Sequence, residues 1–410
     1  MQNIFKNLIK TYDTWSTLKA YLESEEGGLF RVIDKNDNLC IIRYQKNVSN
    51  MTLPHSNWFR SVVWDTDKNR PVCVAPPKTT NSSFPYITLH DAKHAGIQCQ
   101  EQLDGFMINC FKIDGKLYCT SRSKLDASGT FYSNKPFRQL FAESFFHYRF
   151  DTNKEMEDSL QTYSDWMEVP KENEVSVFYS FLVQHKEHRI VSPVEKNEVY
   201  FIHKGIVYED GTIEYCVNVD VPVQQIPCIP LDDSNVNFVD WVKNNLVDKL
   251  WIVKGFVCKD RNGNRWRFQN DKYAVVKSLR GNSASDLDRY VQLYTQNITY
   301  KYLEYFPEET FYFSCYKVFM NNIIIILFKY YTQIYITKEI SLNDAEKMYI
   351  PHLYSLHGIY VTSLRSEGKK MNTIFIQQYF LKQPWQRIAF LIRENQNAYF
   401  SQIEQMVTHA

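Results

Sequence analysis

The sequence predicts an α+β protein in which antiparallel sheets form the larger, N-terminal part and helices form the remainder. Short apolar runs bounded by Gly, Asn and Asp turns recur from about residue 29 to residue 268, which is typical of strands. Beyond about residue 286 apolar residues recur at helical spacing instead. With 410 residues, 44% of them hydrophobic and 15% aromatic, the chain has enough apolar surface for large cores.

The chain is expected to open with a helical segment over residues 1–26. Apolar side chains between Ile4 and Leu22 are three or four residues apart, and Gly27 and Gly28 supply a helix stop. Two hairpins are expected next, because short apolar runs flank polar turns. These pair residues 29–33 with 40–44 and residues 61–64 with 72–75.

The strongest hairpin signal pairs residues 105–113 with 116–120, because Asp114-Gly115 tolerates the positive φ angles of a two-residue turn. A mostly helical pattern follows over residues 139–167. Strands are then expected at 175–184, 199–207, 250–258 and 265–268, with a helix at 236–247.

The pattern predicts two domains, residues 1–284 and residues 285–410. The second is expected to be mostly helical, with helices at 344–356 and 394–407. Its most apolar stretch, residues 318–336, contains Asn, Lys and Gln, so it is expected to be buried in the protein rather than to cross a membrane.

The charge balance and the cysteine pattern limit the partners and the compartment that can be expected. Lys plus Arg number 47 against 46 for Asp plus Glu, so nucleic-acid binding would require a local basic patch. The nine cysteines stand singly with no CxxC, which favours a reducing compartment. The first residues lack a signal peptide's apolar centre, and we expect a cytoplasmic protein.

Several short motifs follow one another in a fixed order. They are Arg60-Ser61-Val62-Val63-Trp64-Asp65, Pro76-Pro77-Lys78, Gln102-Leu103-Asp104-Gly105, residues 178–183 with Arg189-Ile190-Val191, Val253-Lys254-Gly255-Phe256-Val257, and residues 265–272. This order resembles the RNA ligase group of covalent nucleotidyltransferases, whose patterns read RG-hydrophobic-D, PxxK, KxDG, FELV with NRIV, EGxV and KxK. Residues 279–282 and 356–360 resemble the corresponding segments of the members of this group that large DNA viruses encode.

The resemblance implies a nucleotidyltransferase domain, an ATP-grasp-like ligase fold with antiparallel sheets around a groove, followed by the helical domain. It also implies a chemistry. In that family a lysine of lowered pKa attacks the α-phosphorus of ATP or GTP, and a metal held by carboxylates offsets the phosphate charge.

This chain departs from the family at the positions that carry the chemistry. Gln102 occupies the motif position where the family has its nucleophilic lysine. Ser180 and Lys254 occupy positions where the family has carboxylates, and Gln269 replaces the second lysine of the KxK motif. An amide nitrogen has no available lone pair, so Gln102 cannot form the covalent intermediate. A hydroxyl and an ammonium in place of carboxylates disfavour magnesium. We therefore expect no catalytic residue, no bound metal and no cofactor. ATP and Mg²⁺ would be needed only if the protein were an active ligase.

The remaining polar residues of the motifs are candidates for binding phosphate or nucleic acid. They are Arg60, Lys78, Asp104, Arg122, Lys254 and Arg267. A structural interpretation stands beside each one. Gln102 fits a polar strand start, Asp104 fits a turn, and the basic side chains fit a solvated surface.

Two further signals are weaker. His90 and His94 are four residues apart, so a helix would place them on one face, but the sequence shows no HExxH glutamate and no third ligand. Lys93 is a nearby amine, but it lies nine residues before Gln102 and in a separate predicted element. P-loop, Rossmann and esterase motifs do not occur in the sequence.

Three functions remain open from the sequence. The first is a catalytically degenerate RNA-ligase-like protein, a viral nucleic-acid-binding or assembly subunit in the host cytoplasm or the virion. The second is an active ATP-dependent RNA ligase or guanylyltransferase with a non-standard lysine nucleophile. The third is a structural subunit of a virion or complex, with protein partners only.

Overall fold

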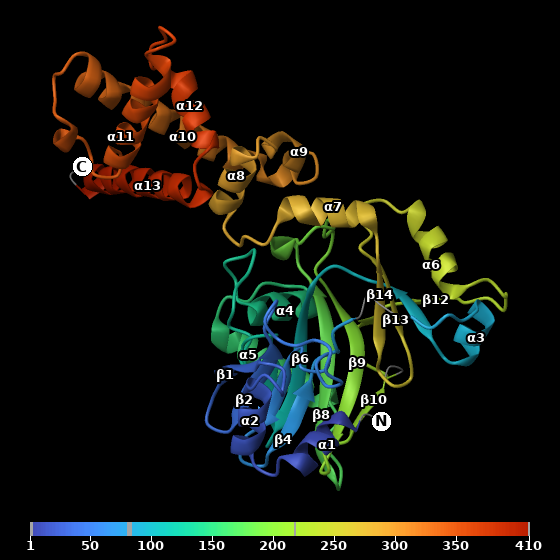
Figure 1. The fold of residues 1–410 in the computed structure, drawn as a ribbon. Coiled ribbons are helices and arrows are strands. Elements are labelled where there is room, and N and C mark those ends of the chain that lie inside the picture. Colours follow the sequence, from blue (N-terminus) through green and yellow to red (C-terminus); the bar gives the residue numbers. More distant parts are fainter. Residues whose placement is uncertain (1–2, 80–83, 217–218, 409–410) are drawn as a thin grey trace. The chain divides into compact units, whose positions relative to one another are not determined.

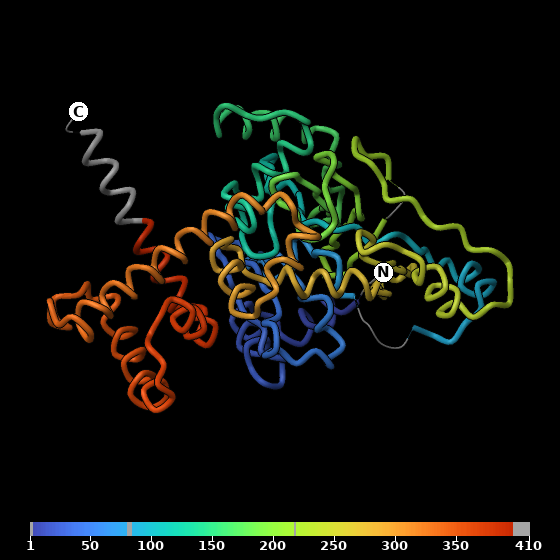
Figure 2. Tube along the Cα trace, turned by 90° about the horizontal axis from the view of Figure 1, so that it is seen from above, coloured from blue at the N-terminus to red at the C-terminus, as the bar shows by residue number. Residues whose placement is uncertain are grey.

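The computed structural model describes residues 3–79, 84–216 and 219–408. The chain divides into two compact units, Met1–Lys277 and Ser278–Ala410. Figure 1 colours the chain from blue to red along the sequence, and Figure 2 follows it as a Cα trace. The sequence placed the domain boundary slightly later, near residue 284.

The first sheet is an antiparallel meander that carries the two N-terminal helices. Its strands are β1 (Phe30–Lys35), β2 (Leu39–Tyr44), β3 (Val62–Asp65) and β4 (Arg70–Val74), and the helices are α1 (Ile4–Thr11) and α2 (Trp15–Glu23). Phe5 of α1, Leu18 of α2 and Trp64 of β3 are fully buried in one core. Both hairpins and the helical start that the sequence predicted are present.

The central sheet has the strand order β10-β9-β8-β6-β7, with β11 added in parallel to β9. The strands are β6 (Phe106–Ile113), β7 (Lys116–Thr120), β8 (Glu174–Gln184), β9 (Glu198–Tyr208), β10 (Ile213–Cys216) and β11 (Gln224–Gln225). Asp114 and Gly115 have φ angles of 50° and 77°, which confirms the predicted tight turn. The long strands β6, β8 and β9 lie side by side, with helices α4 (Phe137–Phe146) and α5 (Asn153–Tyr163) packed against them (Figure 1).

The third sheet has the order β12-β5-β13-β14 and two chemically different faces. Its strands are β5 (Gln98–Glu101), β12 (Cys228–Ile229), β13 (Gly255–Lys259) and β14 (Arg265–Gln269). Cys99 and Cys258 face a buried apolar core shared with helices α3 (Leu89–His94) and α6 (Phe238–Val247). Side chains alternate along a strand, so Lys259 and its cross-strand partner Arg265 lie on the other face.

The second unit consists of helices. They are α8 (Asp286–Thr295), α9 (Thr299–Leu303), α10 (Thr310–Tyr331), α11 (Ile350–Ile359), α12 (Thr373–Leu381) and α13 (Trp385–Thr408). Helix α7 (Asp271–Arg280) carries the chain from the first unit into the second. Arg289 is buried and pairs with Glu309 at 2.8 Å, so a charged residue inside this unit is matched by its counter-ion.

The structure corrects several element boundaries. The predicted helical stretch 139–167 is two helices, because His147 adopts φ 60° after α4 and Thr152 caps α5. The strand predicted at 250–258 begins only at Gly255. The helix predicted at 344–356 begins at Ile350, after a 3₁₀ turn over Leu342–Asp344.

The apolar stretch at residues 318–336 was expected to be buried, and the structure buries only one face of it, which includes Met320, Ile323 and Leu327. The segment Pro307–Ile336 is long and apolar enough to cross a membrane by composition, and 28% of its most apolar window is buried. Phe311, Val318 and Ile325 of α10 are exposed. A single helix of this kind also occurs in soluble proteins, so it does not indicate a membrane partner.

Candidate functional site

The central and third sheets share a cavity of about 200 Å³. The central sheet contributes Ile202, His203 and Tyr215 to its lining, and the third sheet contributes Gln98, Lys259 and Arg265. Because the apolar face of the third sheet is covered by helices, its opposite, polar face supplies this wall. We call this space the inter-sheet cavity.

Basic side chains gather at and beside the inter-sheet cavity. Burial and then the nearby Arg60 lower the pKa of Arg265 to about 9. Burial and then Arg265 lower the pKa of Lys259 to about 7. Burial, Arg122 and Arg267 lower the pKa of Arg60, while Tyr44 opposes the shift. The positive charges therefore lie close enough to destabilise one another.

Most of these cations lack a carboxylate partner among the residues that the structure describes. In the part of the chain that the structure describes, Arg43, Arg60, Arg122, Arg265 and Lys259 form no ion pair with Asp or Glu. Asp260 supplies the carboxylate in the lining of this cavity. It lies in the β13–β14 turn, where its oxygens accept hydrogen bonds from Asn262 and Asn264. We call Arg43, Arg60, Arg122, Lys259, Arg265 and Arg267 the cationic cluster.

Tyr44 at the end of β2 provides an aromatic platform for two of the predicted residues. The Nζ atom of Lys78 lies 5.2 Å from the ring centroid, and the Cζ atom of Arg122 lies 5.0 Å from it. Cation–π contacts hold both side chains without neutralising them. Arg43 donates a hydrogen bond to Ser123 Oγ at 2.5 Å, so the loop after β7 is fixed against the first sheet.

Gln102 lies directly after β5, at the end of the third sheet. Its backbone N–H donates to the carbonyl of Gly255 at 2.8 Å, which extends the pairing of β5 with β13. Its side-chain amide makes no hydrogen bond to the residues that the structure describes. A backbone hydrogen bond thus fixes residue 102 at this position, and no hydrogen bond to a described residue fixes its side chain.

Asp104 is buried at the centre of a hydrogen-bond network. Its carboxylate accepts bonds from Lys254 Nζ at 3.1 Å, Tyr273 Oη at 2.9 Å and the backbone N–H of Val191 at 2.9 Å. Burial opposes ionisation, but Lys254, Tyr273 and Val191 together lower the pKa of Asp104. This carboxylate therefore joins four separate segments of the first unit.

The other two departures from the family pattern also have defined surroundings. Ser180 on β8 is fully buried, donates to Asn109 Oδ1 at 2.7 Å and lies 3.2 Å from His203 Nε2. Burial, Arg265 and Lys259 hold the pKa of His203 well below its ordinary value. Gln269 ends β14 opposite Gly255 and is exposed.

The structure thus separates the predicted binding residues into two groups. Arg60, Lys78, Arg122 and Arg267 lie at the cationic cluster, whereas Asp104 and Lys254 bind each other. Whether any of them contacts phosphate stays a prediction.

The sequence motifs did not point to Arg43 as a site residue. Lys259 and Arg265 stand in an aromatic and basic run at residues 251–267, which the sequence offers either as a surface that binds a single strand or as ordinary sheet residues. The signal that was available is the alternation of Lys259 and Val257 with buried Cys258 along β13.

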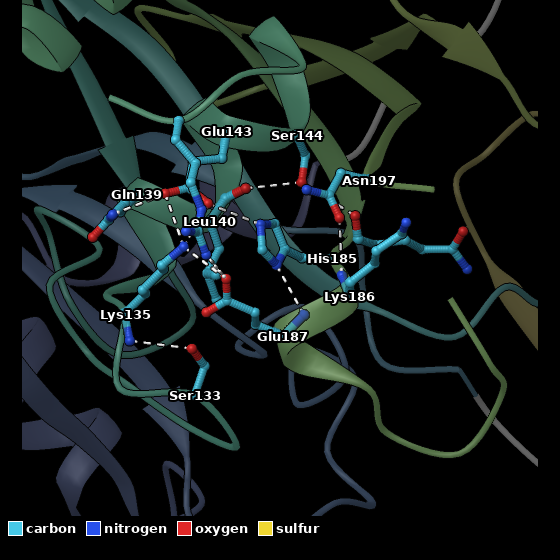
Figure 3. A network of polar contacts seen from close by, with 12 residues as sticks. Ser133, Lys135, Gln139, Leu140, Glu143, Ser144, His185, Lys186, Glu187 and Asn197 are labelled. Carbon is cyan, nitrogen blue, oxygen red and sulfur yellow. Dashed lines mark hydrogen bonds and ion pairs between the residues drawn. The ribbon is translucent and has the colours of Figure 1, made fainter. Parts of the chain in front are cut away.

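A second polar network lies at the other face of the central sheet, where α4 meets the end of β8 (Figure 3). Lys135 donates to Glu143 at 2.9 Å and to Glu187 at 2.8 Å, and His185 lies 3.1 Å from Glu143. Burial opposes the charge on Lys135, but Glu187 and Glu143 more than offset it and raise its pKa. We call these residues the α4 network.

No protein-family model matches this sequence, and no curated protein matches it. Solved structures do match. The chain is similar in structure to ATP-dependent RNA ligases. Two forms of an archaeal ATP-dependent RNA ligase match at a TM-score of 0.35, with 10% identity over 92% of this chain and 88% of that one, and 8% identity over 75% and 74%.

A variant of the Naegleria gruberi RNA ligase with ATP and Mn matches at a TM-score of 0.29 and 11% identity. The match covers 47% of this chain and 57% of that ligase, so this chain spans little more than half the ligase's length.

Proposed function

We propose that this RNA-ligase-like chain binds the phosphate backbone of a nucleic acid at the cationic cluster and does not form a covalent nucleotidyl intermediate. The observation that carries the proposal is the accumulation of Arg60, Arg122 and Arg265 with no carboxylate partner among the described residues. Uncompensated cations cost stability, and an anionic ligand removes that cost.

The ligand chemistry follows from the side chains. Guanidinium groups bind phosphate oxygens through two parallel hydrogen bonds, and the arrangement needs no metal ion. Tyr44, already contacted by Lys78 and Arg122, offers an aromatic surface at the same place. Single-stranded RNA combines regularly spaced phosphates with bases that stack on aromatic rings.

Loss of catalysis is the second part of the proposal. It is supported by Gln102 at the nucleophile position and by Lys254, which pairs with Asp104 where the family pattern has a metal-binding carboxylate. The resemblance of residues 279–282 and 356–360 to viral sequences adds the further proposal of a viral assembly or RNA-binding subunit in the cytoplasm or virion.

A salt-dependent binding measurement tests the proposal. Wild type is compared with Arg60→Ala/Lys78→Ala and with the control Arg31→Ala/Lys35→Ala, which removes the same charge from exposed positions on β1. We expect the first variant to weaken binding to single-stranded RNA at least tenfold and the control to change it little. Absence of binding by wild type at low salt would favour the structural-subunit function.

One observation favours an active nucleotidyltransferase as the second candidate. Lys259 lines the inter-sheet cavity and has a pKa of about 7, so a large share of its amine is unprotonated at neutral pH. Its neutral Nζ atom would attack the α-phosphorus of ATP or GTP. An N–P bond forms, the bond from the α-phosphorus to the bridging oxygen breaks to release pyrophosphate, and the amine loses one proton to solvent. Lys93, the other amine considered, instead pairs with Asp233 at 2.6 Å.

Mass spectrometry separates the two candidates. After incubation with ATP or GTP and Mg²⁺ or Mn²⁺, the proposed binding protein keeps its mass. A gain of one AMP or GMP that disappears in Lys259→Arg would establish the enzyme and overturn the non-covalent proposal.

A further inference from the structure

The exposed end of helix α3 lies outside the cationic cluster and brings together three side chains that bind metals. His90 and His94 are on one face of α3, with ring centroids 4.3 Å apart. Asp233, from the segment between β12 and α6, lies beside them. One donor atom from each residue lies within 4.8 Å of the donors of the other two. The sequence paired the two histidines but offered no third ligand, which the tertiary structure supplies.

The backbone fixes this arrangement. His90 N–H donates to Ser234 O at 3.1 Å and Leu89 N–H donates to Val236 O at 3.0 Å, so the Asp233 segment is hydrogen-bonded to the start of α3. Phe238, the first residue of α6, donates its N–H to Ile87 O, just before α3, at 3.0 Å. Figure 1 shows α3 beside the chain that leads from β12 to α6. The backbones of the three ligand residues are therefore held next to one another.

Neighbouring side chains orient the donors further. Lys93 Nζ donates to Asp233 Oδ2 at 2.6 Å, and the other oxygen, Oδ1, lies 3.9 Å from His94 Nε2. The hydrogen bond from Lys93 lowers the pKa of Asp233, which keeps the carboxylate ionised. Asp91 Oδ1 lies 3.7 Å from His90 Nδ1, too far for a hydrogen bond. A hydrogen-bond partner on the second atom of a ligand is typical of protein metal sites, and Lys93 is that partner for Asp233.

We propose that His90, His94 and Asp233 form a binding site for a borderline divalent metal ion, Zn²⁺ in the first place. Two imidazoles and one carboxylate are a common zinc ligand set, with bonds of about 2.0–2.2 Å. Ligands on one tetrahedral ion lie roughly 3.4 Å apart, so donor atoms that lie within 4.8 Å of one another need to approach by up to about 1.4 Å. The side chains are exposed, which leaves them free to rotate and leaves a coordination position for water.

The ion would join α3 to the segment that precedes α6. Both elements contribute to the apolar core of the third sheet, through Leu89 and Phe238. Binding to the folded state alone raises stability, so the ion is expected to raise the unfolding temperature of the first unit.

Titration of the full chain, freed of metals with EDTA, tests the site. Isothermal titration with ZnCl₂ is expected to give one site that weakens at least tenfold in His94→Ala and in Asp233→Asn. The exposed His147 lies elsewhere at a positive φ, so His147→Asn is a matched control and should leave the affinity unchanged. Unfolding temperatures without metal show that each variant folds.

Cobalt distinguishes this site from adventitious binding to thiols. Cys228 is exposed on β12, so Co²⁺ spectra are recorded for wild type and Cys228→Ser. The proposal predicts d–d bands without a thiolate charge-transfer band, and identical spectra for both proteins. A thiolate band, equal zinc affinity in His94→Ala, or no binding to wild type would each overturn the proposal.

Discussion

The α4 network and the cationic cluster are both groups of charged side chains in the first unit, but they are built in opposite ways. In the α4 network Lys135 lies between Glu143 and Glu187, and its pKa is raised. In the cationic cluster Lys259 and Arg265 lie opposite each other on paired strands, and both pKa values are lowered. In the first arrangement opposite charges offset one another, whereas in the second neighbouring charges of the same sign disfavour the protonated forms.

The largest effect on the free energy of unfolding is expected at Asp104, which pairs with Lys254. Asp104→Asn replaces one acceptor oxygen by a donor, so either the N–H of Val191 or the ammonium of Lys254 loses its partner. We expect a loss of about 3–5 kcal/mol in the free energy of unfolding, measured by chemical denaturation.

The pH dependence of Asp104 supplies a second readout. Its folded pKa is lowered, so its stabilisation is present above about pH 4 and is lost as the pH falls through the folded pKa. Asp126→Asn is the comparison, at an exposed aspartate whose pKa is also lowered but whose hydrogen-bond donor is the nearby Ser128. Equal stability of the Asp104 and Asp126 variants would mean that Asp104 is not a structural hub.

Removing a charge from the cationic cluster is expected to have the opposite sign. The pKa of Lys259 falls from 10.5 to about 7, so between these pH values the unfolded chain binds more protons and stability rises with pH. Lys259→Met should therefore raise the free energy of unfolding at pH 7 by about 4 kcal/mol and flatten the rise between about pH 7 and pH 10.

Lys154→Met, at an exposed lysine, serves as the control for Lys259. If Lys259→Met is instead less stable than wild type and keeps the same pH profile, then the amine is neutralised by its surroundings and the comparison fails.

A smaller loss is expected in the α4 network. Glu143→Gln keeps the shape of the side chain but removes the charge that faces Lys135 and His185. We expect a loss of about 1–3 kcal/mol in urea unfolding. In the double variant with Lys135→Met the two effects should not be additive, because both substitutions break one interaction. Strict additivity would contradict the pairing.

The smallest effect on stability, and the most informative for binding, is expected from Arg60→Ala. Relief of repulsion with Arg122 should leave the free energy of unfolding within about 1 kcal/mol of wild type. The slope of log affinity for single-stranded RNA against log salt should become shallower by about 1. An unchanged slope would place the nucleic acid elsewhere.

Much of the local structure was readable from the residues. Asp114-Gly115 predicted its hairpin, and the positive φ angles of both residues confirm the turn. The break between α4 and α5 was missed, because the left-handed conformation of His147 is not encoded by a glycine.

The sequence by itself determined which chemistry the motifs retain: Gln102 has no nucleophilic amine, whatever surrounds it. Only the tertiary structure decided which charges meet. Strand pairing placed Lys259 against Arg265, and the β12–α6 segment brought Asp233 to His94. Contacts between residues far apart in the chain depend on sheet register and loop path, and neither residue type nor local periodicity specifies these.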